Sequence, residues 1–167
     1  LDYQIHKKIS QNFSQNFVST LINYDQESTR HSPVLLIIFS FFEKLNFQDI
    51  YIRMIGLHFC LLLPFIFYKI IRLKFDKFDK NKSIFLISLI FISPTFISLS
   101  IWPDSRIYGL IFFTLSIYFY LKFEIKNRFS DAIKCTLSYT LSAYISLNFS
   151  LFAIFFLLKF LIFYKFN

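Results

Sequence analysis

The chain has 167 residues, with 18 Lys plus Arg against 10 Asp plus Glu, and its formal net charge is +8. It is 56% hydrophobic and 17% charged, whereas an ordinary soluble domain is about 45–50% apolar and about 25% charged, so a soluble globule and a disordered chain are both disfavoured. Only 2 Gly and 4 Pro interrupt long apolar runs, which also argues against a barrel of short alternating strands. The composition predicts an all-α, polytopic integral membrane protein with about four or five transmembrane helices.

Residues 1–49 are predicted to form an outer, extracytoplasmic loop with amphipathic surface helices. Apolar side chains recur every fourth position there, at Ile5, Ile9, Phe13, Phe17 and Leu21. This spacing places one apolar stripe on a helix, and such a helix can lie along a membrane surface. The later apolar run 34–42 is too short to cross a bilayer, so we expect an interfacial or re-entrant element.

Residues 50–165 are predicted to form the transmembrane region. A bilayer core about 30 Å thick requires about 20 apolar residues per helix. Segments of suitable length and composition are 50–71, 83–102, 107–121, 132–147 and 149–164. The last two are separated at the polar residues Asn148 and Ser150, because residues 132–164 as one helix would be too long for an upright span. One long helix over this stretch is the alternative.

Basic residues predict which side of the membrane each loop faces. Residues 72–82 and 122–134 together contain nine Lys and Arg, whereas the connection 102–106 contains one. Lys- and Arg-rich short loops are cytoplasmic as a rule, so Asp104 and Arg106 are expected on the outer side together with residues 1–49. These loops explain much of the positive charge, and no nucleic-acid partner is expected.

The remaining chemistry is expected among the polar residues at the outer side, since the motifs of soluble enzymes are missing. Asp104 and Arg106 end one span and begin the next, where their charges can act on an anionic headgroup. The alternative is structural: Arg106 as an interfacial anchor and Asp104 as a helix cap. His58 is expected to be a buried histidine bonded to a neighbouring helix, and the two cysteines, Cys60 and Cys135, to be small buried hydrophobes.

Several short motifs follow one another along the chain. They are Asp2-Tyr3, His31-Ser32-Pro33, Ile52-Arg53 and Asp104-Ser105-Arg106-Ile107-Tyr108. Their order and predicted sidedness resemble the polytopic membrane glycosyltransferases of the C-type superfamily, in particular bacterial relatives of the dolichyl-phosphate-mannose protein mannosyltransferases. The chain begins at Leu1 and its only methionine is Met54, so we expect an amino-terminal fragment of such a protein, which would be inactive alone if later segments complete the site.

The resemblance implies an inverting transferase in the bacterial inner (plasma) membrane, with membrane lipids around it. It would move a sugar from a polyprenyl-phosphate donor to a lipid, glycan or protein acceptor at the outer face. Asp2 would be the general base, and Asp104 would orient Arg106 or bind a divalent metal ion, the one cofactor implied. Arg106, with Lys7 or Lys8, would stabilise the leaving phosphate. His31 and Tyr108 would line the cleft.

Two other classes of function remain open from the residues alone. A membrane carrier would place ionisable side chains along a path near mid-membrane. In this chain His58 alone gives only weak support for such a path. A non-catalytic assembly subunit would bind a partner and have no transfer activity of its own.

Overall fold

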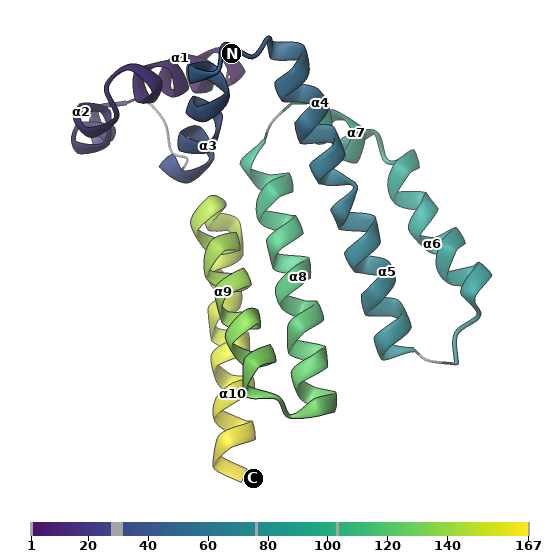
Figure 1. Cartoon of the computed structure of the whole chain (residues 1–167). Coiled ribbons are helices and arrows are strands. Elements are labelled where there is room, and N and C mark those ends of the chain that lie inside the picture. The colour runs from purple at the N-terminus through teal and green to yellow at the C-terminus, as the bar shows by residue number, and fades with distance from the viewer. Residues whose placement is uncertain (1, 28–31, 76, 103, 167) are drawn as a thin grey trace.

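A computed structural model of the chain describes residues 2–27, 32–75, 77–102 and 104–166, without the side chains of residues 2, 3, 165 and 166. Within these ranges every regular element is helical, as the composition predicted, and the elements are arranged as in Figure 1. They are α1 (Asp2–Gln15), α2 (Phe17–Ile22), η1 (Tyr24–Gln26), α3 (Pro33–Lys44), α4 (Asp49–Cys60), α5 (Leu62–Lys74), α6 (Lys80–Ile92), α7 (Pro94–Ile101), α8 (Ser105–Lys126), α9 (Phe129–Ile145), η2 (Leu147–Phe152) and α10 (Ala153–Phe166).

Three helical stretches of the described chain are long and apolar enough to cross a membrane. They are Asp49–Lys74, in which α4 continues into α5, Ser105–Lys126, and Leu147–Tyr164. The number rises to four if α6 and α7 are counted as one broken span, so the described chain has three or four candidate spans against the four or five predicted. The 17-residue α9 does not belong to this set, although it packs along α8.

The predicted span 83–102 is interrupted in its middle. The helix ends at Ile92, and α7 starts at Pro94 at an angle of 63° to α6. Proline has no backbone N–H and disfavours helical geometry in the residue before it, and Ser93 is accordingly extended, with φ −68° and ψ 116°. The Ser93 hydroxyl accepts a hydrogen bond from the Phe96 amide at 3.3 Å and so caps the new helix.

The apolar stripe of the first residues is divided between two environments. Ile9 and Phe13 of α1 are 1% and 2% exposed, and they pack against Leu36 of α3. The helix breaks at Asn16, and beyond it Phe17 and Leu21 are 45% and 44% exposed. The expectation of one helix over this stripe is therefore wrong, because the helix is divided at Asn16, and the first part of the stripe packs against α3.

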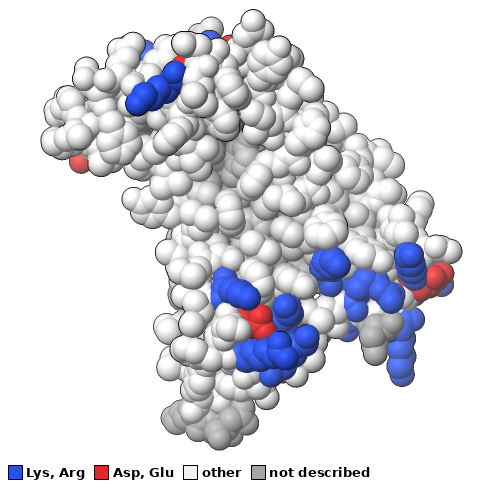
Figure 2. Space-filling view, viewed as in Figure 1, with Lys and Arg blue, Asp and Glu red and all other residues white. Residues whose placement is uncertain are grey.

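The two ends of the helices differ in charge. The loops 72–82 and 122–134 lie at one end, here called the lysine end, and Figure 2 shows Lys and Arg gathered there. The helices α1 to α3 and the connection from α7 to α8 lie at the other end, here called the Asp104 end (Figure 1). The predicted sharing of one end by residues 1–49 and Asp104 thus matches the arrangement of the helices, while the side of a membrane that each end faces stays a prediction.

Helices α8 and α9 approach closely at a glycine. The Ser142 hydroxyl of α9 donates a hydrogen bond to the Gly109 carbonyl of α8 at 2.7 Å, and both residues are buried. A Cβ atom at position 109 would lie 2.7 Å from the Cβ of Ser146 and 2.9 Å from a ring carbon of Phe149. Glycine is therefore required here for packing.

Replacement Gly109→Ala should destabilise the chain. Overpacking costs about 1–3 kcal/mol, and a contact between two Cβ atoms puts this site at the upper end of that range. The loss then exceeds the ~1 kcal/mol by which Ala favours a helix over Gly. We expect a lower midpoint of thermal unfolding in detergent, whereas Thr140→Ala, at an exposed position of α9, should leave it nearly unchanged. An equal or higher midpoint for Gly109→Ala would contradict the packing described.

Candidate functional site

The first turn of α8 holds the best-defined polar group at the Asp104 end. Asp104 is the N-cap, and its Oδ1 accepts hydrogen bonds from the Arg106 amide at 2.7 Å and from Arg106 Nε at 3.0 Å. Its Oδ2 lies 2.7 Å from an Arg106 Nη. The carboxylate side chain is 20% exposed and the arginine side chain 61%. One carboxylate therefore caps the helix and also holds an exposed guanidinium in a bidentate pair.

A second arginine lies at the same end. The guanidinium carbon of Arg53, on α4, stands 4.1 Å from the centre of the Trp102 ring, which follows α7. A cation over an indole face is attracted by the ring electrons, so this stack joins α4 to the segment that leads into Asp104. Arg53 was noted from the sequence as part of the Ile52-Arg53 motif near the start of a predicted span, but it was not among the predicted site residues.

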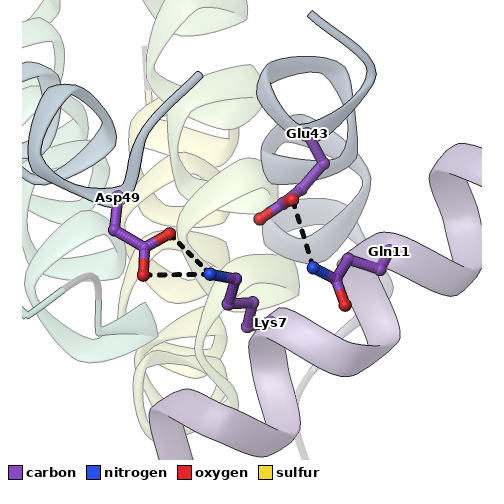
Figure 3. Close-up of polar contacts among 4 residues, drawn as sticks. All are labelled: Lys7, Gln11, Glu43 and Asp49. Atoms are coloured by element: carbon purple, nitrogen blue, oxygen red, sulfur yellow. Dashed lines mark hydrogen bonds and ion pairs between the residues drawn. The ribbon is translucent and has the colours of Figure 1, made fainter. Parts of the chain in front are cut away.

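Helix α1 is joined to α4 by an ion pair. Lys7 Nζ lies 2.8 and 3.0 Å from the two carboxylate oxygens of Asp49, in the first turn of α4 (Figure 3). The amide of Gln11 also donates to Glu43 at the end of α3, at 3.4 Å. Both side chains of the ion pair are about one-third exposed, so its chief effect is orientation. Lys7, which was predicted to contact the donor phosphate, is thus paired with Asp49. Asp49 was not among the predicted site residues.

The other predicted residues of the outer loop have different positions. Lys8 is exposed on α1 and has no carboxylate within ion-pair distance among the described residues. Asp2 begins α1, but its side chain lies outside the described part of the chain, as does all of His31.

Tyr108, which was expected to line a cleft, lies in the core of the described helices. It is 7% exposed and packs in the core, with ring centres 5.6 Å from Phe59 and 6.4 Å from Phe39. Two residues along an α-helix correspond to a rotation of about 200°, so Arg106 and Tyr108 point to different faces of α8. The Tyr108 hydroxyl packs against Gly56 of α4, and a Cβ atom on Gly56 would be only 2.6 Å from the hydroxyl oxygen.

The remaining candidates are accounted for structurally. Cys60 and Cys135 are buried free thiols, as predicted. His58 is exposed on α4, and its Nδ1 lies 2.7 Å from the Met54 carbonyl of the same helix, so the expectation of a buried histidine bonded to another helix is wrong. The described residues contain no group of three or more His, Cys, Asp or Glu side chains that could hold a metal ion.

Comparisons of the chain with models of protein families, with curated proteins and with solved structures find no match. A function for the chain therefore rests on the side chains at the Asp104 end.

The contact between Gly56 and Tyr108 can be tested by a double-mutant cycle. Gly56→Ala should lower the midpoint of thermal unfolding, because its methyl group would overlap the tyrosine hydroxyl, at a cost of about 1–3 kcal/mol. Tyr108→Phe removes that hydroxyl and leaves the next ring atom at 3.9 Å, an ordinary contact, so it should restore most of the loss. Equal effects of Gly56→Ala with and without Tyr108→Phe would contradict this packing.

Proposed function

We propose that the chain is a membrane part of a glycosyltransferase that moves a sugar from a polyprenyl-phosphate donor to an acceptor at the outer face of the cell membrane. The observation that carries the proposal is the exposed Arg106 guanidinium, held by Asp104 at the start of a helix long enough to span a membrane. The order of motifs along the sequence adds to it.

A transferase of this kind must stabilise negative charge on the departing phosphate. A guanidinium offers planar N–H donors and keeps its charge, and it is most effective when it is oriented before the reaction begins. The bidentate contact with Asp104 supplies such orientation for Arg106. Arg53, stacked on Trp102, and the exposed Lys8 add two further cations at the Asp104 end.

The proposed reaction is a single displacement. The acceptor oxygen forms a bond to the anomeric carbon while the bond from that carbon to the phosphate oxygen breaks, and the acceptor proton passes to a carboxylate. The proposed base is Asp2, the first residue of α1. The ion pair of Lys7 with Asp49 supports this role, since it holds α1 against the start of α4 (Figure 3).

Replacement of Arg106 tests the proposal in the complete protein. Loss of one preorganised donor to a developing oxyanion lowers rates by about 10²–10³-fold, so Arg106→Ala should reduce sugar transfer by about a hundredfold or more. Arg106→Lys should recover part of the rate, because the charge remains while the planar donor pair is lost. The assay follows a labelled sugar from a polyprenyl phosphate in membranes.

The matched control is Lys44→Ala, which removes an exposed cation from the end of α3 and should leave transfer unchanged. Undiminished transfer by Arg106→Ala at normal membrane levels would overturn the assigned role. Solute movement without sugar transfer would favour a carrier, and tight co-purification with a partner, without transfer, would favour an assembly subunit.

A further inference from the structure

Two loops that are far apart in the sequence form one surface at the lysine end. Helices α5 and α8 pack along each other, and Lys74 at the end of α5 lies 3.8 Å from Glu124 near the end of α8. Figure 2 shows the basic side chains of both loops on neighbouring parts of this end. The basic surface is defined here as Arg72, Lys74, Lys77, Lys80, Lys82, Lys122, Lys126, Arg128 and Lys134.

The three carboxylates of this region that the structure describes are already engaged. Glu124 faces Lys74, and Asp131, whose side chain is 4% exposed, lies 3.8 Å from Lys122. Asp79 caps α6 by accepting a hydrogen bond from the Asn81 amide at 3.1 Å. The two loops contain nine basic residues against four acidic ones, so five positive charges are in excess.

Five of these cations are exposed and have no carboxylate within ion-pair distance among the described residues. Lys80 and Lys82 lie at the start of α6, Lys126 and Arg128 in the second loop or beside it, and Lys134 in α9. Like charges collected on one surface raise its potential and attract anions. The surface is therefore suited to a ligand that carries negative charge to both loops.

Exposed aromatic side chains stand beside these cations. Phe75 and Phe129 are 57% and 68% exposed, at the boundary between the apolar helices and the basic loops. Phe75 directly follows the apolar stretch Asp49–Lys74, which is long enough to span a membrane, and this position favours a lipid over a soluble acidic partner. A phospholipid offers both an anionic headgroup for the lysines and an acyl region for the phenyl rings.

We propose that the basic surface binds anionic phospholipid headgroups, and that a bound headgroup bridges the loop between α5 and α6 and the loop between α8 and α9. The proposal rests on membrane insertion of the apolar helices and is independent of the transferase activity. It goes beyond orientation in the membrane, since it assigns these loops a ligand and a cross-link between two helix pairs.

Lipid binding to the complete chain in a mild detergent tests the proposal. Phosphatidylglycerol and phosphatidylcholine with identical acyl chains are titrated, and bound lipid is counted by native mass spectrometry together with the midpoint of thermal unfolding. We expect phosphatidylglycerol to bind more tightly, to raise the midpoint and to dissociate as salt is added. Equal binding of the two lipids would overturn the proposal.

Matched double variants locate the site. Lys80→Gln with Lys126→Gln removes one charge from each loop and leaves the observed ion pairs intact. Because each basic residue near an anionic surface strengthens binding about fivefold, this variant should bind phosphatidylglycerol about 25-fold more weakly. The control, Lys44→Gln with Lys159→Gln, removes two exposed charges that do not belong to the basic surface, and it should bind as the unchanged chain does.

Equal weakening in both double variants would contradict a site at the lysine end. Displacement of the lipid by inorganic phosphate at equal concentration would show a free-anion site and overturn the proposal as well. The assay contains no sugar donor, so its failure leaves the transferase proposal standing, and loss of sugar transfer in Arg106→Ala leaves the lipid site untouched.

Discussion

Close packing of α8 against its neighbours is the constraint on which the rest of the structure depends. Apolar helices in lipid gain little from hydrophobic association, so their contacts rely on close approach and on hydrogen bonds between helices. The bond from Ser142 to the Gly109 carbonyl is such a contact. Because α9 is held on one side and α5 on another, both ends of α8 are fixed, and with them Arg106 and Lys122.

Buried serines allow the helices to approach closely without leaving hydroxyl donors unsatisfied. Ser83, Ser100, Ser116 and Ser142 have no exposed surface. The hydroxyl groups of Ser100 and Ser116 donate to carbonyls of their own helices at 2.7 Å, so small side chains are buried without a lost donor. The core of this Phe-rich chain thus combines large aromatic rings with small polar side chains. The small side chains, such as that of Ser142, lie where two helices pack closely.

Features that depend on local pattern were predictable from the sequence. Long apolar runs predicted the helices, and the position of Asp104 at the start of a span suggested the cap, while its pairing with Arg106 was implied by the family resemblance. Features that depend on distant residues were not predictable, since no local pattern links Lys7 to Asp49 or Arg53 to Trp102. The burial of Tyr108 was not predictable from the motif alone, because residues two apart on a helix point to different faces and only the packing of α8 shows which face is covered.

The break before Pro94 determines where α7 delivers the chain. Eight residues of helix extend about 12 Å, and at 63° to α6 they advance only ~5 Å along the direction of that helix. An unbroken helix would carry Trp102 about 7 Å further along that direction. The break before Pro94 therefore sets how far along the direction of α6 the next helix, α8, begins. It thereby sets the position of the first charged side chains of α8.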